Sequence, residues 1–309
     1  MKRDICIGLA LFALLLIAPL FGGPYGLRLM TIALMYIVLA ISWNFIGGMA
    51  GYPSFAASAF FGLGAYAGAV IQVSGAPMGV AWCAAGIIAV VFSGLLGWVL
   101  LRLRGHYFAI ASFALVEVLR VLVNSMTNLT GGGMGLNLPI PQMSSVQAQA
   151  TFFFHAMLGL AVITFAVSMA VSYSRLGFGL RCIEQNESAA DILGINTTLH
   201  KVVAFVLSAV FVGIAGAIYA SWVYYIEPPD VFDIMYSIKS IVMVLLGGTG
   251  SVFGPIIGAV LYLSLEEIVW RNLLQFNTGA LGVLIVLLVL YLPKGVLSLR
   301  IASFWKMSA

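Results

Sequence analysis

The chain has 309 residues, of which 62% are hydrophobic and only 8% are charged, and its mean hydropathy is +1.12. A soluble domain carries roughly a quarter charged residues, so this composition excludes a soluble enzyme or binding module. The net charge of +4 is typical of a membrane protein that collects Lys and Arg in its cytoplasmic loops. The three cysteines lie far apart, which indicates neither a disulfide framework nor a metal site.

Long apolar runs predict the fold class. The lipid core requires about 20 apolar residues per helix, whereas a membrane β-barrel would show short alternating segments. We therefore predict an all-α fold, a polytopic transmembrane helical bundle of about ten spans that forms one domain over residues 1–309. The spans lie near 5–21, 29–46, 55–73, 80–101, 107–126, 151–173, 202–223, 236–247, 252–270 and 279–293.

The first and the eighth of these windows differ from ordinary spans. The first follows the basic start MKRD, but no small-residue cleavage site of the A-x-A kind comes after it. We therefore interpret it as a retained span rather than as a signal peptide. The eighth window, 236–247, is too short to cross a membrane alone. It predicts half of a broken helix or a re-entrant segment.

Basic residues predict the orientation of the bundle. With the N-terminus inside, ten Lys and Arg residues fall in the cytoplasm and about two fall outside. The same choice places Glu227, Asp230 and Asp233 outside. We therefore predict an N-in, C-in topology with a cytoplasmic loop at 174–201 and a long external loop at 127–150.

Two glycine-rich stretches interrupt the apolar runs. "IGGMAGYPSF" at 46–55 and "LGGTGSVFGP" at 246–255 each begin near a double glycine and contain a proline. Glycine loosens a helix and proline removes a backbone donor, so both stretches predict broken helices. Broken helices at corresponding positions of two halves indicate a transport pathway. The pathway candidates in these stretches are Gly47, Gly48, Gly51, Ser54, Phe55, Gly247, Gly248 and Gly250.

Few ionisable residues fall within the predicted spans. Glu117 and Arg120 are three residues apart, so they share a helix face and can pair. A charge in lipid is expensive, which leaves two interpretations: a buried ion pair that fixes helix packing, or a place for Glu117 beside the pathway. Glu266, Glu267 and Arg271 cluster near an external helix end, where we expect solvated side chains.

Common catalytic and nucleotide-binding motifs are absent from the sequence. It contains no G-x-x-x-x-G-K-[ST] phosphate loop, no H-E-x-x-H metal motif and no G-x-S-x-G nucleophile elbow. We therefore expect a protein that is not an enzyme and that holds no cofactor or metal of its own. If the chain transports a solute, the energy comes from an ion gradient or from a partner protein.

The stretch "GLRCIEQNESAADILGI", residues 179–195, is charged although it lies between apolar runs. The residues between Leu180 and Leu193 are good helix formers, and Gly194 stands where a helix C-terminal glycine belongs. A solvated linker has no need of Ile192, Leu193 and Ile195, so these side chains indicate a docking surface. The two adjacent alanines would let the helix pack on a foreign surface. One helical stripe contains Leu180, Ile183, Glu187 and Ala190.

Within that stretch, "ESAADILGI" resembles the coupling-loop signature of ABC importer permeases, an E-A-A triplet followed four residues later by glycine. Ser188 stands in for the first alanine of the triplet. Residues 179–220 are similar to the M-type subunit of the branched-chain amino acid permease family, as are "GYPSFAASAFFGLGAYAGA", "LTGGGMGL" and "VLLGGTGSVFGPIIGA". One departure is "SFAASAF", where Ala56 and Ala57 replace a Gly-His pair of many relatives, which could alter the pathway lining or the cargo. The coupling residues that the resemblance implies are Arg181, Glu184, Glu187, Ala189, Ala190 and Gly194.

The resemblance implies a heteromeric importer in the bacterial inner membrane. This chain and a related H-type permease subunit would form the channel. Two cytoplasmic ATP-binding subunits would dock on the coupling loops and would bind the ATP and Mg²⁺. A periplasmic substrate-binding protein would deliver a branched-chain or other aliphatic amino acid, and backbone groups at the helix breaks would hold its zwitterion.

Three alternatives stay open at the level of sequence. The first alternative concerns the cargo: because relatives that carry urea or short-chain amides share the same motifs, this chain could be a permease for those solutes. An ion-coupled secondary transporter would need no ATPase, but it predicts several intramembrane acids along a path, and only Glu117 is a good candidate. A membrane-embedded enzyme would need a nucleophile with its base or a set of metal ligands, and neither pattern is present.

Overall fold

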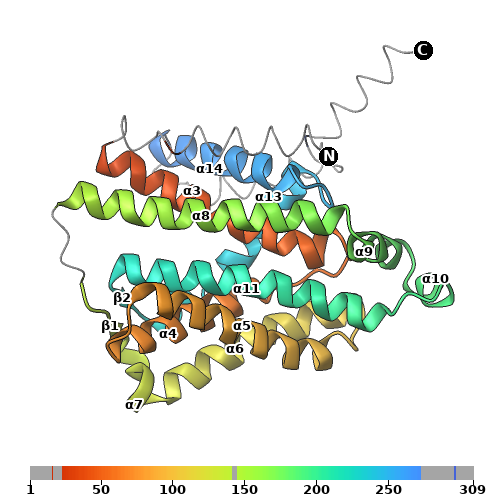
Figure 1. The fold of residues 1–309 in the computed structure, drawn as a ribbon, viewed down its shortest axis with the longest axis horizontal. Helices are drawn as coiled ribbons and strands as arrows, with labels where there is room; N and C mark the ends of the chain where they lie inside the picture. Colours follow the sequence, from red (N-terminus) through yellow and green to blue (C-terminus); the bar gives the residue numbers. More distant parts are fainter. Residues whose placement is uncertain (1–15, 17–22, 141–144, 273–295, 297–309) are drawn as a thin grey trace, which may run out of the picture.

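The computed structural model describes residues 23–140 and 145–272, together with the single positions 16 and 296. Within these residues the fold is a bundle of helices that lie side by side along the long axis of the molecule (Figure 1). The predicted all-α class is confirmed. The predicted spans near 5–21 and 279–293 lie outside the described residues.

The longer helices agree with the predicted windows to within a few residues at most ends. Their bounds are α3 (Pro24–Trp43), α4 (Ala57–Val73), α5 (Met78–Leu100), α6 (His106–Ser125), α8 (Val146–Ser172), α9 (Arg175–Gln185), α11 (Thr197–Val223), α13 (Met235–Gly247) and α14 (Gly254–Asn272). The shorter elements are the π-helix η1 (Asn44–Gly48), α7 (Thr127–Thr130), the 3₁₀ helix η2 (Gly132–Met134), β1 (Leu136–Asn137), α10 (Glu187–Ile192), β2 (Tyr225–Ile226) and α12 (Pro228–Val231).

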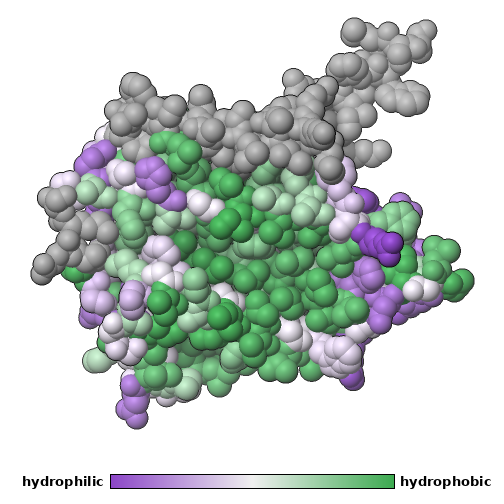
Figure 2. Space-filling model, viewed as in Figure 1, coloured by the Kyte–Doolittle hydropathy of each residue, from purple (hydrophilic) through white to green (hydrophobic). Residues whose placement is uncertain are grey.

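Five helices among the described residues are long and apolar enough to cross a membrane: Pro24–Gly48, Met78–Leu100, His106–Ser125, Val146–Ser172 and Thr197–Val223. A further apolar helix, Ala57–Val73, is shorter. A band of apolar side chains covers the visible side of the bundle, and polar side chains gather toward its ends (Figure 2). The structure therefore describes a multi-pass membrane protein. The count of ten spans and the N-in, C-in topology stay predictions.

The two predicted loops lie at opposite ends of the bundle (Figure 1). At one end, β1 pairs antiparallel with β2, so that Leu136 faces Ile226. At the other end lie α9 and α10. The predicted C-terminal bound of the long loop at 127–150 is wrong, because α8 already begins at Val146. The Ser145 side chain caps this helix by accepting a hydrogen bond from Ala148 N at 3.1 Å.

Both predicted helix breaks are confirmed. The first apolar helix changes from α to π geometry over Asn44–Gly48 and stops, and helical structure resumes at Ala57. Between α13 and α14 the chain is non-helical from 248 to 253. Gly51, Gly248 and Gly250 adopt φ of 72°, 120° and 71°, which is backbone that side chains other than glycine rarely adopt. The short eighth window is helix α13, with 13 residues.

Close backbone contact holds the centre of the bundle together. Helix α11 packs on α4 and α5, and small residues line the contact with α4. A Cβ atom at Gly64 would lie 2.0 Å from Gly213 O, and one at Gly216 would lie 2.1 Å from Phe61 O. Such contacts are impossible with larger residues, so glycine lets the two helices approach as membrane helices commonly do. Phe60 and Phe61 are buried beside this contact.

Candidate coupling site and helix breaks

The charged segment at one end of the bundle is two helices, and the single helix predicted between Leu180 and Leu193 is wrong. Asn186 separates α9 from α10 with an extended backbone, φ −162° and ψ 109°. Its side chain accepts a hydrogen bond from Ala189 N at 3.0 Å and so caps α10. Asparagine favours such a cap over the helix interior. Gly194, at φ 80°, ends the segment as predicted.

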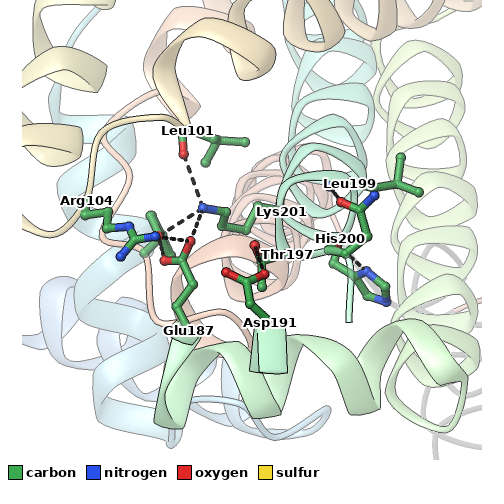
Figure 3. A network of polar contacts seen from close by, with 10 residues as sticks. Leu101, Arg104, Glu187, Asp191, Thr197, Leu199, His200 and Lys201 are labelled. Atoms are coloured by element: carbon green, nitrogen blue, oxygen red, sulfur yellow. Dashed lines mark hydrogen bonds and ion pairs between the residues drawn. The ribbon is translucent and has the colours of Figure 1, made fainter. Parts of the chain in front are cut away.

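Glu187, the first residue of α10, points into the bundle and makes three contacts there (Figure 3). Its Oε1 lies 2.8 Å from Lys201 Nζ and 3.3 Å from Arg104 Nη2. Its Oε2 accepts a hydrogen bond of 2.5 Å from the Tyr52 hydroxyl. The carboxylate therefore joins α10 to α11, to the loop after α5 and to the segment after η1.

Lys201 is the centre of this network. Its side chain is only 4% exposed. Besides binding Glu187, Nζ donates to Tyr52 Oη and to Leu101 O, each at 3.2 Å, and lies 4.9 Å from the centre of the Tyr52 ring. A buried ammonium group is costly unless it is paired and hydrogen-bonded, and here all three donor directions have partners. In the sequence Lys201 stands directly before the apolar window at 202–223, where we expected a cytoplasmic cation, and α11 begins one turn earlier, at Thr197.

Electrostatics favour the ionised form of Glu187. Partial burial alone would raise the pKa of Glu187, but the hydrogen bonds from Lys201 and Tyr52 and the charges of Lys201 and Arg104 outweigh it, so the pKa lies below its usual value. A carboxylate whose pKa is lowered by folding stabilises the protein at neutral pH. This contribution is lost as the pH falls through the lowered pKa.

The stripe predicted on the 179–195 segment is present, but it faces the bundle. Leu180, Ile183 and Ala190 are buried, so Ala190 packs on its own chain and the prediction of a foreign surface there is wrong. Ala189 is exposed. Ile192 and Leu193 are 87% and 73% exposed, whereas Ile195 is half-buried. The predicted docking role of these side chains stays a prediction.

Two other coupling candidates connect α9 to its neighbours. Arg181 donates a hydrogen bond from Nη2 to Ser172 O at 3.1 Å, which ties α9 to the end of α8. Glu184 lies beside Gly51, where a Cβ atom would come 3.0 Å from Glu184 Cγ. The segment between η1 and α4 therefore lies against both α9 and α10. The sequence alone could not predict that Gly51 and Tyr52 contact α9 and α10.

A polar cavity of about 470 Å³ adjoins the Glu187 network. Arg102 and Arg104 line it from the loop after α5, and Asp191 and Thr198 line it from α10 and α11. Thr197 donates a hydrogen bond to Asp191 Oδ1 at 2.9 Å. Among the described residues, no group of three His, Cys, Asp or Glu side chains is placed to hold a metal ion.

The two helix breaks meet inside the bundle at Asn44. This fully buried residue begins the π-helix, and its Nδ2 donates to Ser251 O at 2.9 Å. Its Oδ1 accepts from Gly250 N at 3.0 Å. A Cβ atom at Gly48 would lie 1.8 Å from Asn44 Oδ1 and 2.8 Å from Gly250 N, so glycine is required for the contact. Sequence reasoning missed Asn44, which looked like one polar residue at the end of an apolar run.

The remaining pathway candidates occupy different environments. Gly247 packs so closely on α14 that a Cβ atom would lie 1.7 Å from Gly254 O, and Gly248 is buried beside it. The Ser54 carbonyl accepts a hydrogen bond from Trp43 Nε1 at 2.7 Å. The backbone of Phe55 bonds to two serines, Ser112 Oγ at 2.9 Å and Ser237 Oγ at 2.6 Å. Of the predicted pathway positions, Gly48 and Gly250 are in direct contact, whereas Ser54 and Phe55 bond to residues outside the predicted set.

Two predictions about charges inside the spans need correction. Glu117 pairs with Arg120 at 2.6 Å, but the side chains are 47% and 41% exposed, so the pair is not buried; a role for Glu117 beside the pathway stays a prediction. Glu266 is not solvated, because its side chain is 17% exposed and lies 2.7 Å from Lys239 Nζ. Sequence reasoning missed Lys239, whose partner lies 27 residues away on the next helix.

The described residues define a polytopic α-helical membrane protein, with two helix breaks that meet inside the bundle and a polar segment fastened at one end. Residues 25–292 match the family described as the permease component of branched-chain amino acid transport systems. The match covers most of the chain. The chain therefore belongs to this family of ABC transport permeases, and the relatives below place it with the M-type subunits.

Individual relatives agree with the family assignment. The chain is 28% identical to the high-affinity branched-chain amino acid permease protein LivM of Salmonella typhimurium, covering 94% of this chain and 74% of the relative. It is 26% identical to the permease protein LivH of Escherichia coli K12, covering 86% of this chain and 92% of the relative. A probable LivM of Methanocaldococcus jannaschii is 22% identical over 68% of each chain. No solved structure gives a significant match.

Proposed function

We propose that this chain is the permease subunit of an ATP-driven importer that carries branched-chain amino acids across the bacterial inner membrane. The family and the relatives, which are named for branched-chain amino acid transport, support the reaction and the cargo. The observation that carries the coupling is α10, which is fastened inside by Glu187 and exposes Ile192 and Leu193 at its other end. A helix that binds its own bundle at one end and exposes apolar side chains at the other is suited to dock an ATPase subunit.

The partners follow from what this chain lacks and from its relatives. The similarity to both LivM and LivH proteins supports an H-type permease as the second membrane subunit. Two cytoplasmic ATP-binding subunits hold ATP and Mg²⁺, since the sequence has no phosphate loop. One of them docks on α9 and α10 of this chain, and the other docks on the H-type partner. A periplasmic binding protein delivers the amino acid at the opposite end, where β1 and β2 lie.

Our proposal for coupling uses the contacts of Glu187. When the ATPase subunits close, they push α10, and Glu187 moves with it. Its hydrogen bond to Tyr52 passes the displacement to the segment after η1, where Tyr52 N also donates to Ile46 O at 3.1 Å. Asn44 then connects η1 to the second helix break through Gly250 and Ser251. Packed interiors switch between discrete arrangements, so a small push can move both breaks together.

Replacing Ile192 and Leu193 together with serine is expected to weaken ATPase binding at least tenfold without unfolding the permease. Burying one such side chain is worth about 1.5–3 kcal/mol, and about 1.4 kcal/mol corresponds to a factor of ten in affinity. Both side chains are exposed in the chain alone, so serine removes no internal packing. The measurement is co-purification of the ATPase subunits with the tagged permease, together with their dissociation constant.

Leu129→Ser is the matched control for this experiment. Leu129 is 52% exposed and lies in α7, at the opposite end of the bundle from α10. The control should bind the ATPase subunits as the unchanged chain does. Equal ATPase binding by the Ile192→Ser/Leu193→Ser variant and the unchanged chain would show that α10 is not the docking element.

A further inference from the structure

We propose that a cavity between α3, α13 and α14 binds a zwitterionic aliphatic amino acid, an inference that rests on the transport function proposed above. The cavity has a volume of about 520 Å³, which is within the range of small-molecule sites. Its polar wall contains Lys239 from α13 and the adjacent carboxylates Glu266 and Glu267 from α14, of which Glu266 pairs with Lys239. Much of the remaining lining is aliphatic and includes Leu29, Ile32 and Leu263.

A half-buried ion pair between two apolar helices requires an explanation. Lys239 Nζ donates a hydrogen bond of 2.7 Å to Glu266 Oε1, and the two side chains are 23% and 17% exposed. The ammonium group also lies 5.4 Å from the centre of the Tyr36 ring, which lines the same cavity. Charges among apolar helices are expensive, and they commonly mark a substrate or ion pathway. The pair lies beside open space, where a ligand can reach both charges.

The charges match those of a free amino acid. The substrate carboxylate can accept from Lys239 Nζ while the substrate ammonium group donates to Glu266, so two ion pairs replace one. Lys239, Glu266 and the two substrate charges then each have a partner of opposite sign. A simple anion bound to Lys239 would leave Glu266 without a partner, and a simple cation bound to Glu266 would leave Lys239 without one. An unpaired charge is costly away from water. The aliphatic side chain would pack on Leu29, Ile32 and Leu263.

The cavity is placed to receive substrate from the proposed periplasmic side. Helix α3 begins at the end of the bundle that carries β1 and β2, opposite to α9 and α10 (Figure 1). Tyr36 is twelve residues after Pro24, which corresponds to about 18 Å along an α-helix. The site therefore extends from that end toward the middle of α3. The helix breaks at Asn44 lie further along the same helix.

Binding of radiolabelled leucine to the assembled importer in lipid nanodiscs, without the periplasmic binding protein, tests the site. Lys239→Met should weaken leucine binding at least tenfold and should abolish discrimination between leucine and leucinamide, which lacks the carboxylate. Glu266→Gln should abolish discrimination between leucine and 4-methylpentanoate, which lacks the ammonium group. A structural role would not produce this analogue-specific pattern. Arg28→Met is the matched control, because Arg28 is a cation near the start of α3 that does not line the cavity. This variant should still prefer leucine to leucinamide and to 4-methylpentanoate.

The double variant Lys239→Met/Glu266→Met separates binding from packing. Replacing a buried ion pair with apolar side chains is often neutral for stability, so this variant should assemble and hydrolyse ATP but fail to bind leucine. Wild-type leucine binding and uptake in the double variant would overturn the proposal and leave the transport function standing. ATP-driven leucine uptake by the unchanged importer without leucine binding in nanodiscs would overturn it as well. If the unchanged importer accumulates no aliphatic amino acid, the proposed function fails, and the site fails with it.

Discussion

Replacing Lys201 with methionine is expected to destabilise the permease by about 3 kcal/mol and to uncouple ATP hydrolysis from uptake. The side chain is 4% exposed and binds Glu187 at 2.8 Å, so its removal leaves a carboxylate that is only 13% exposed without its main partner. Removing one partner of a buried pair costs roughly 3–5 kcal/mol. Arg104 also contacts Glu187, which places this case at the lower end. Thermal unfolding of the purified complex measures the loss.

The double variant Lys201→Met/Glu187→Met distinguishes a structural role from a coupling role. It removes both charges, so most of the stability should return. Coupling should stay lost, because α10 no longer has a polar connection to Tyr52. The hydrogen bond between Asp191 and Thr197 still joins α10 to α11, but it does not reach the segment after η1. The ratio of substrate imported to ATP hydrolysed measures this. A double variant with full coupling would contradict the proposed role of Glu187, whatever its stability.

Replacing Asn44 with leucine is expected to cost roughly 2–5 kcal/mol and to reduce uptake strongly. The amide satisfies Gly250 N and Ser251 O, which lie at the second helix break. Leucine would leave both backbone groups without these bonds, and an unsatisfied buried polar group costs roughly 1–3 kcal/mol. The larger apolar side chain would also press on Gly48.

Amide hydrogen exchange at residues 248–253 provides the specific measurement for Asn44→Leu. If Asn44 joins the two breaks, exchange should accelerate there while the α4–α11 contact stays protected. Asn128→Leu, a change at an exposed position in α7, is the matched control and should leave exchange and uptake unchanged. Unchanged protection at 248–253 in Asn44→Leu would contradict the idea that this amide holds the second break.

Local sequence signals predicted much of the fold. The lengths of the apolar runs predicted the described spans. The short window at 236–247 corresponds to α13 because glycines end this helix at Gly247 and Gly248. The two breaks followed from glycine and proline, which act on the backbone whatever surrounds them. Ile192 and Leu193 could be predicted as exposed because a charged stretch gives such side chains little room to be buried.

The partners of buried polar groups could not be predicted, since they depend on contacts between distant parts of the chain. Tyr52 and Lys201 are 149 residues apart, and Asn44 lies 207 residues from Ser251. Periodicity predicts which residues share a helix face but not whether that face packs on its own bundle, so the burial of Ala190 could not be predicted. Periodicity also does not predict the end of α9 at Asn186, because that cap depends on the backbone conformation of one residue.

ATP-dependent accumulation of radiolabelled leucine tests the central claim most directly. The permease would be reconstituted in liposomes with its H-type partner, the two ATP-binding subunits and the loaded binding protein. We predict leucine accumulation that requires ATP and is lost in the Ile192→Ser/Leu193→Ser variant. Accumulation of urea or a short amide in place of leucine, or leucine uptake driven by an ion gradient without ATP, would contradict the account.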